Sequence, residues 1–376
     1  MKTMRTKQWL MTAALTAACW NGMVAQQIVE LPDRVKMGQE RVKVRRDIQL
    51  PQIDEFHLLK CDFHIHTVFS DGIVWPSLRV SEAWEEGLDV IALSDHVEGQ
   101  PAREGIMKGD LDLAFKNAEE EALRRGIILI KGAEISRSMP PGHLNALFLN
   151  DVDALQKLDV TDALREARRQ GAYIFWNHPG WNVKEVKWHD LHEQLWKENL
   201  IHGIEVFNEF EWYPKALEWA KEKKLTLMAN TDVHDVIERL YDKNQVSHRP
   251  LTLVLAKENT ASAIQDALFA GRTFLWFYDT LMGSEEYLMK FFQGAVRVQP
   301  AHYATESVEY VTITNTCDVP FRLKAISDAK GYPSAIHLPA RSSVVVAVPK
   351  NSKASVTYEV INLLTAYQQG IEVVLF

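Results

Sequence analysis

The chain has 376 residues, of which 47% are hydrophobic and 24% are charged, and its formal net charge is −8 at pH 7. This length allows one large and one small domain. The net negative charge argues against general nucleic-acid binding, which depends on long-range attraction to phosphates.

The first 25 residues have the order of a secretory signal peptide. Residues 2–7 contain three basic side chains, an uncharged apolar run follows at 9–20, and small residues end at Ala25. We therefore expect cleavage after Ala25 and export to the periplasm. Lipoprotein anchoring through Cys19, in a stretch similar to a lipobox, is the alternative.

Removal of this segment would take away three positive charges and no negative ones, so the mature chain would carry −8 − 3 = −11. We expect no transmembrane segment in the mature chain. Two distant cysteines, Cys61 and Cys317, would remain; they do not make a disulfide framework and are expected to be buried and free. Residues 26–57 have mixed charges and little periodicity, which indicates an extended lead-in.

Residues 58–280 alternate short apolar runs with amphipathic segments. Strands are predicted at 58–66, 88–94, 127–134, 144–149, 172–177, 203–207 and 225–230, and helices at 76–86, 110–125, 160–170, 189–198 and 213–223. Apolar strands separated by helices are typical of a parallel sheet that is buried on both faces. About seven such units indicate a closed TIM-like βα barrel rather than an open doubly wound sheet.

Residues 281–376 have a different sequence pattern. Segments rich in β-forming residues are found at 307–314, 321–326, 342–348 and 355–361, with turn-forming residues between them. Short strands at this spacing predict a small all-β sandwich. The expected fold is therefore α/β, a barrel followed by a β-sandwich, with the boundary near 281–290.

Polar residues gather where the predicted barrel strands end. His64 and His66 end the first strand, and two residues apart on a strand they would point to the same side. Comparable positions along the chain are occupied by Asp71, Asp95, His96, Glu134, His143, His178, Asp232 and His234. Because the carboxyl ends of barrel strands meet at one mouth, we expect these side chains to converge.

Imidazoles and carboxylates that converge in this way suit metals such as zinc, manganese and iron. A single His-x-His pair is weak evidence, because 13 histidines in 376 residues would give about 0.4 such pairs by chance. Considered one at a time, these residues have simpler explanations. His178 would be an ordinary loop residue, and Glu134 would form an ion pair with a basic residue such as Arg137. Six histidines on one rim together predict a metal site, and nine ligands are too many for one tetrahedral ion.

The order of these residues resembles the polymerase-and-histidinol-phosphatase (PHP) family of metal-dependent phosphoesterases. Its pattern of His-x-His, Asp or Glu, His, Glu, His, His and Asp-x-His is matched over residues 58–276 with no position missing. The resemblance implies a distorted (β/α)7 barrel and up to three divalent metal ions (Zn, Mn or Fe). The matching positions are His64, His66, Asp71, His96, Glu134, His143, His178, Asp232 and His234.

The resemblance also implies how the ligands divide among three ions. The sets are His64, His66, Glu134 and Asp232; Glu134, His143 and His178; and Asp71, His96 and His234. Glu134, Asp232 and His234 are the residues expected to be catalytic. Three dications and three carboxylates would leave about +3 at the mouth, which attracts a small phosphorylated substrate. A hydroxide shared between metals would be the nucleophile.

Other residues are candidates for substrate contact or support. Arg137 and Arg249 would bind phosphate oxygens, or else form surface or inter-domain ion pairs. Trp181 and Trp212 would stack on a sugar or base, or else pack as buried aromatics. Asp95 would orient a ligand imidazole or cap the next turn.

Two other functions remain open. An amidohydrolase-like barrel would cleave C–N bonds, often with a modified lysine between two metals, but here Lys131 is out of phase with Glu134. A catalytically idle module that binds metal or glycan would be expected to have lost ligands, and none is missing. The choice between monoester and diester and the oligomeric state also stay open.

Overall fold

The computed structural model describes residues 44–98, 111–156, 158–241, 248–326, 330–351 and 355–376. The expected signal peptide at 1–25, with Cys19, and the lead-in up to residue 43 lie outside these ranges. None of the helices in the described part of the chain has the length and apolar character that a membrane span requires. Cys61 and Cys317 are both buried and free, which confirms that prediction.

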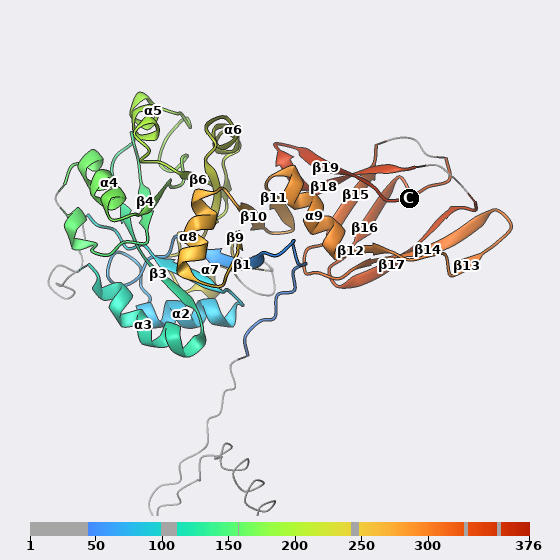
Figure 1. Cartoon of the computed structure of the whole chain (residues 1–376), viewed down its shortest axis with the longest axis horizontal. Coiled ribbons are helices and arrows are strands. Elements are labelled where there is room, and N and C mark those ends of the chain that lie inside the picture. Colours follow the sequence, from blue (N-terminus) through green and yellow to red (C-terminus); the bar gives the residue numbers. More distant parts are fainter. Residues whose placement is uncertain (1–43, 99–110, 157, 242–247, 327–329, 352–354) are drawn as a thin grey trace, which may run out of the picture. The chain divides into compact units, whose positions relative to one another are not determined.

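An α/β barrel is formed by the first part of the described chain (Figure 1). Its strands are β1 (His57–Asp62), β2 (Val90–Leu93), β3 (Ile128–Ile135), β4 (Leu144–Leu147), β5 (Tyr173–Trp176), β6 (Gly203–Asn208) and β8 (Thr226–Asn230). The helices between them are α2 (Pro76–Glu85), α3 (Leu113–Arg125), η1 (Asp153–Leu155), α4 (Val160–Arg169), α5 (Asp190–Lys197) and α6 (Pro214–Lys223). The predicted elements are confirmed, although the first strand ends earlier, at Asp62.

These elements follow from local chemistry. β2, β4, β5 and β6 are buried along their whole length, as strands covered on both faces must be. Helix α4 begins where the Asp159 side chain accepts a hydrogen bond from the backbone N of Asp162. Helix α3 ends at Gly126, whose φ of 67° suits glycine.

The barrel sheet is mixed rather than fully parallel. β4 is antiparallel to both β3 and β5, and β9 (Leu251–Ala256) is antiparallel to β1. β10 (Thr273–Phe277) pairs with β9 in the same sense after α8 (Ala261–Phe269). The expectation of a parallel sheet is wrong for these strands. The loop at 136–143 between β3 and β4 is too short for the crossover of a dozen or more residues that a parallel connection needs.

The barrel closes where the chain beyond β8 meets the chain beyond β1. The backbone N of Asp232 donates to His64 O at 2.9 Å, and the backbone N of His66 donates to Val233 O at 3.1 Å. Ile65 and Val233 form an isolated parallel bridge between these hydrogen bonds. The closure therefore brings together two segments that both contain predicted ligands.

An all-β region follows the barrel. One of its sheets contains β11 (Thr280–Met282), β15 (Phe321–Ala325), β16 (Ala335–Leu338), β18 (Thr357–Ala366) and β19 (Gln369–Val374), and it is continuous with the barrel sheet because β11 pairs with β10. The other contains β12 (Val296–Val298), β13 (Tyr303–Ala304), β14 (Val308–Asn315) and β17 (Ser342–Pro349), and α9 (Glu285–Ala295) precedes them. Less and more exposed residues alternate along β15 and β17, which is typical of strands with one face on a core. The predicted β-sandwich is confirmed, and its boundary at 281–290 stays a prediction.

Candidate metal centre

The structure brings all nine predicted ligands together at one end of the barrel, where His143 directly precedes the antiparallel strand β4 and the others lie at or beyond the carboxyl ends of strands. They fall into overlapping groups whose ligand atoms all lie within 4.8 Å of one another. These groups are His66, Asp71, His96 and His234; His64, His66 and Glu134; His64, His178 and Asp232; and His96, Glu134 and His143. The convergence expected from the strand ends is therefore present.

His64 and His66 lie just beyond β1 rather than on it, because the strand ends at Asp62. The isolated bridge at Ile65 keeps this stretch of chain extended against the segment after β8. The two imidazoles consequently remain neighbours, with ring centroids 5.2 Å apart.

The most buried ligands have the spacing of groups around shared cations. His64 Nε2 lies 3.1 Å from Asp232 Oδ1 and 3.5 Å from Glu134 Oε1. His66 Nε2 lies 3.0 Å from the same Asp232 oxygen, and His178 Nε2 lies 3.4 Å from Glu134 Oε1. Two ligands at zinc bond lengths of about 2.0–2.1 Å in a tetrahedral site are roughly 3.3–3.4 Å apart. The geometry therefore fits a bound metal.

Three buried atoms in this region have no hydrogen-bond partner. They are Nε2 of His64, Nε2 of His66 and Oδ1 of Asp232. A buried polar atom without a partner costs about 1–3 kcal/mol, so three of them in contact are unfavourable unless another group satisfies them. A divalent cation would satisfy all three, and the donor set of imidazoles and carboxylates suits one.

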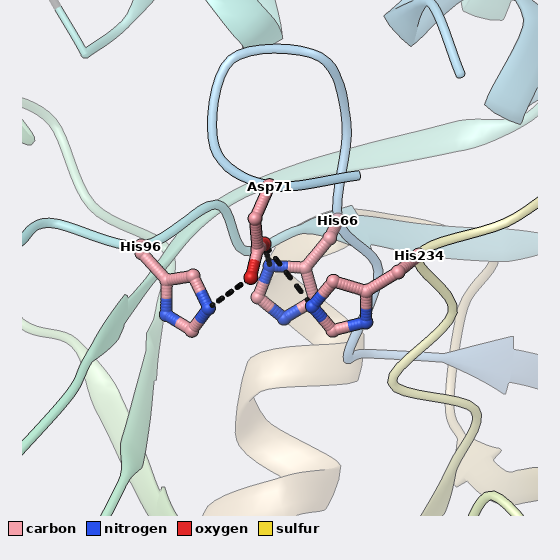
Figure 2. Close-up of side chains that lie close together, drawn as sticks. All are labelled: His66, Asp71, His96 and His234. Atoms are coloured by element: carbon pink, nitrogen blue, oxygen red, sulfur yellow. Dashed lines mark ion pairs between the residues drawn. The ribbon is translucent and has the colours of Figure 1, made fainter. Parts of the chain in front are cut away.

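A more exposed part of the site contains Asp71, His96 and His234. Figure 2 shows the Asp71 carboxylate among the imidazoles of His66, His96 and His234. Its oxygens lie 3.4 Å from His96 Nε2 and 3.1 Å from His234 Nε2. The side chains of Asp71 and His234 are 58% and 39% exposed.

These differences divide the site into two groups. The rim group is Asp71, His96 and His234. The deep group is His64, His66, Glu134, His143, His178 and Asp232, of which His64, His66 and Glu134 have no exposed side-chain surface.

At His96, Nδ1 lies 2.6 Å from both Ser136 Oγ and Oε2 of the predicted ligand Glu134. Three other imidazoles are oriented by an acceptor at Nδ1. The acceptors are Glu205 Oε1 for His64 (3.0 Å), Ser70 Oγ for His66 (3.2 Å) and the backbone O of Asp232 for His234 (2.7 Å). These partners assign the proton to Nδ1. The Nε2 lone pair of each ring is then available on the side of the site.

Glu205, on β6, is a supporting carboxylate that the sequence analysis missed. Its Oε1 faces His64 and also accepts a hydrogen bond from Asn230 at 2.9 Å. Its Oε2 accepts from the backbone N of His178 at 2.8 Å and from the Asn208 side chain at 2.9 Å. One carboxylate therefore positions two members of the deep group. The sequence signal that could have identified Glu205 is that it is the one charged residue in the apolar strand β6.

Asp95 supports the His66 side of the site. Its carboxylate accepts hydrogen bonds from the backbone N and the hydroxyl of Thr67, both at 2.7 Å, and from the Ser70 hydroxyl at 2.6 Å. Ser70 in turn accepts from His66. Asp95 therefore acts on the imidazole through Ser70, which favours the orienting role over the capping role.

Arg79, on α2, is a second supporting residue that the sequence analysis missed. Its guanidinium donates to the backbone oxygens of His66 (2.9 Å), Val233 (3.1 Å) and Asp235 (2.8 Å), and it forms an ion pair with Glu82 at 2.8 Å. The residue is 1% exposed. Arg79 therefore ties together the two segments that meet at the barrel closure.

The carboxylates of the deep group are held in the ionised form. Burial alone would raise the pKa of Glu134, but neighbouring imidazoles, with His64 first, hold it well below its usual range. Burial also opposes ionisation of Asp232, and its pKa is held well below the usual range by His64 and His66. The deep group therefore presents negative charge to a bound cation.

The imidazoles respond to the same charges. Burial would lower the pKa of His64, but Asp232 and Glu205 raise it well above its usual value. Burial lowers the pKa of His66 to about 4, so this ring is neutral, as a metal ligand must be. Without a metal, protons on imidazoles such as His64 balance the negative charge of the carboxylates. A bound cation would balance this charge instead, and the imidazoles would lose those protons.

Two ligands have a backbone conformation that L residues rarely adopt. The φ angle is 53° at Asp232 and 23° at His178. Such positions cost on the order of 1–3 kcal/mol and persist where the surroundings determine them, often at functional sites. The backbone N of each residue donates to a site partner, His64 O for Asp232 and Glu205 for His178.

The predicted substrate-binding arginines have different positions. Arg137 lines a cavity beside His143 and His178. Arg249 is 1% exposed, and its guanidinium contacts Asp62 at 3.1 Å and Glu86 at 2.6 Å. The expectation that Arg249 binds substrate is wrong, because two buried carboxylates enclose it.

The two tryptophans also differ. Trp181 is 54% exposed and lines the same cavity as Arg137. Trp212, on β7 (Glu211–Trp212), packs against Phe207 and Tyr367, with ring centroids 5.7 and 5.3 Å apart. Trp181 is available to a ligand, and Trp212 is a packed aromatic.

Comparison with known proteins extends these observations. A family model described as DUF5001: Ig-like domain matches residues 296–376. A curated 5'-3' exoribonuclease from Haemophilus influenzae is 33% identical over 113 residues, which are 29% of this chain and 36% of that protein. The chain therefore spans about a third of the length of this relative.

Solved structures give a longer match. A protein from Bifidobacterium adolescentis, whose structure was described as that of a proposed metal-dependent phosphoesterase, superposes with a TM-score of 0.36. It is 16% identical, over 46% of this chain and 87% of that chain. A two-domain protein from Bacteroides vulgatus, described as containing a predicted PHP-like metal-dependent phosphoesterase, has a TM-score of 0.84 and 38% identity, over 90% of this chain and 99% of that chain. With this identity over almost the whole of both chains, the protein belongs to the PHP-like family of metal-dependent phosphoesterases, in its two-domain form.

Proposed function

We propose that this protein hydrolyses a phosphate monoester or diester of a small molecule, at a centre of up to three divalent metal ions. The observation that carries the proposal is the convergence of nine ligand side chains whose inward atoms include three without a hydrogen-bond partner. Zinc, manganese and iron are the candidate metals, because mixed imidazole and carboxylate ligands suit them. The proposed location is the periplasm.

The division of the ligands into three sets follows the family pattern. Within the sets, the nitrogen-to-oxygen distances of ligand pairs are 3.0–3.6 Å, and the sets adjoin one another, because His96 Nδ1 lies 2.6 Å from Glu134 Oε2. The deep group would hold two ions, one through His64, His66, Glu134 and Asp232 and one through Glu134, His143 and His178. The rim group would hold the third through Asp71, His96 and His234. Bound ions would supply positive charge for the phosphate oxygens and would acidify water at neutral pH.

The protein residues fix these positions and remain in the required protonation state. Glu134 is shared by both deep sets, and Asn177 Nδ2 donates to its Oε1 at 2.8 Å. Asp232 contacts both His64 and His66 through Oδ1. His234 is the most exposed imidazole of the nine ligands, and its Nε2 faces Asp71. These contacts support Glu134, Asp232 and His234 as the catalytic residues.

The alternative of C–N bond hydrolysis has less support. A bridging modified lysine would have to face the metals from β3, where Glu134 stands. Lys131 Nζ donates to Asn150 O at 3.0 Å and forms an ion pair with Asp112 at 3.1 Å. These partners hold the lysine away from Glu134.

The test is hydrolysis of para-nitrophenyl phosphate and bis-para-nitrophenyl phosphate with added manganese or zinc, together with metal analysis of the protein. His178→Ala removes a ligand, and His337→Ala, at an exposed position on β16, is the control. We expect metal-dependent turnover that is lost in the first variant and kept in the second. The preferred compound would distinguish a monoesterase from a diesterase. A protein that binds no metal, or a metal-loaded protein that hydrolyses neither compound, would contradict the proposal.

A further inference from the structure

We propose that the cavity beside the deep group binds the leaving group of the ester, and that it selects a leaving group with an uncharged, planar aromatic ring. This inference rests on the proposed phosphoesterase function and names the substrate class of the same site.

The cavity has a volume of about 500 Å³ and opens beside His143 and His178. The loop between β3 and β4 lines it with residues 136–139 and 142, and the loop after β5 lines it with residues 181–183. The volume is in the range of about 300–1,000 Å³ that is typical of small-molecule sites. Because two proposed ligands form part of the wall, a phosphate held at the metals would extend its organic group into this cavity.

Trp181 gives the cavity a flat apolar wall. Its ring centroid lies 5.0 Å from that of His143 and 5.6 Å from that of His178, so the indole stands directly beside the ligands. More than half of the side chain is exposed. A large aromatic surface in water beside a polar site is a favourable partner for another ring, which would stack on it and remove apolar surface from solvent.

The position of Trp181 is set by its loop. The backbone N of Trp181 donates to His178 O at 2.9 Å, which closes a turn directly after a proposed ligand. Gly180 packs so closely on the buried Tyr213 that a Cβ at this position would lie 2.5 Å from Tyr213 Cε1. The turn is therefore held against the barrel. Binding of a ring to Trp181 would cost little free energy for ordering this loop.

The charge of the cavity favours a neutral leaving group. Apart from the two histidines, Arg137 is the charged side chain among the described residues that line it. Arg137 forms an ion pair with Glu98 and donates to the backbone oxygens of Ser136 and Leu158. Its charge is thus compensated, and the described lining offers no free cation to a leaving group with a second negative charge. A neutral ring fits the remaining serine, methionine, asparagine and valine side chains.

The test compares benzyl phosphate with cyclohexylmethyl phosphate, whose leaving alcohols have similar size but differ in ring planarity. We expect the metal-loaded protein to favour the benzyl ester by about 3- to 10-fold in kcat/KM, the range of an aromatic stacking contact. Trp181→Leu should bring this ratio close to one, and Trp181→Phe should keep most of it. Phe269→Leu, which removes an exposed aromatic ring elsewhere, should leave the ratio as it is.

Calorimetric binding of benzylphosphonate and cyclohexylmethylphosphonate gives a readout that does not depend on turnover. The same preference, and the same loss in Trp181→Leu, is expected. Hydrolysis of both esters at equal rates would overturn the ring selection and leave the phosphoesterase function in place. A preference that persists in Trp181→Leu would also overturn the assignment to this cavity. Hydrolysis of neither ester, with the benzyl preference still present in binding, would overturn the phosphoesterase function alone.

Discussion

The deep and rim groups use the same kinds of side chain in opposite surroundings. His64, His66 and Glu134 have no exposed side-chain surface, and Glu205 and Ser70 hold the two imidazoles from behind. Asp71 is 58% exposed and stands on a turn. A ligand that is already fixed loses little freedom when a metal binds, whereas a ligand on a loop must first be ordered. The site therefore combines a prearranged part with an adaptable part, and metal affinity should differ between them.

The largest effect is expected from Glu134→Gln. Glutamine keeps the size of the side chain but loses the charge that both deep sets share, so the two deep ions and the turnover should be lost together. Metal analysis and hydrolysis of a para-nitrophenyl ester would measure this. Glu285→Gln, at an exposed position on α9, is the control. Full metal content in Glu134→Gln would show that this residue is not the shared ligand.

A smaller effect is expected from Glu205→Gln, which does not touch the metals. The carboxylate accepts hydrogen bonds on both oxygens, and an amide nitrogen cannot accept one. Misaligned His64 and His178 should weaken metal binding in the deep group by about 10- to 100-fold, as is common when a supporting partner is lost. Competition with a chelating dye would measure the affinity. An unchanged affinity would mean that packing alone orients His64.

Asp71→Asn should affect the rim group alone. Asparagine keeps the shape of the side chain but removes the charge between His96 and His234, so about one of the proposed ions should be lost while the deep pair stays. In the unmodified protein, a chelator added in steps should remove the rim ion first. Metal analysis after each step would show the order. Loss of all ions at one chelator concentration would contradict the division into two groups.

An effect on stability that should leave both groups unchanged concerns His202 just before β6. Burial, with Arg168 next, lowers the pKa of His202 to about 4, and its Nδ1 accepts a hydrogen bond from the backbone N of Ile174. The folded protein keeps this ring neutral, so between pH 6.5 and 4 the unfolded chain binds more protons. The free energy of unfolding should therefore fall as the pH is lowered through this window, by up to about 3 kcal/mol, and be fully present above it.

Urea unfolding of the metal-free protein at pH 7 and pH 5 would measure the effect of His202. His202→Asn keeps an acceptor near the same place and does not titrate, so its stability should depend less on pH in this range. An equal pH dependence in both proteins would show that other groups cause it.

The convergence of the nine predicted ligands was predictable because a barrel converts a position at a strand end into a position at the mouth. The supporting residues were not, because their roles depend on long-range packing. Glu205 was visible as a charge in an apolar strand, but its partners were not. No local pattern indicates that Arg79 is buried, and only the packing of α2 on the barrel closure shows it.

The wrong expectation for Arg249 has the same cause. Its partners Asp62 and Glu86 lie 187 and 163 positions away in the chain, and no local pattern indicates such pairs. The antiparallel direction of β4 is different, since the short loop before it was visible. The apolar composition of β4 suggested parallel pairing, but the length of the loop before it allows only an antiparallel connection.

The barrel closure has a consequence for the order of events during synthesis. His64 and Asp232, which are hydrogen-bonded there, are 232 − 64 = 168 positions apart, so the first leaves the ribosome long before the second. Until β8 and the segment after it have been made, His64 and His66 lack the carboxylate that completes their set. Metal binding at the proposed deep group would therefore require that the segments after β1 and β8 have met.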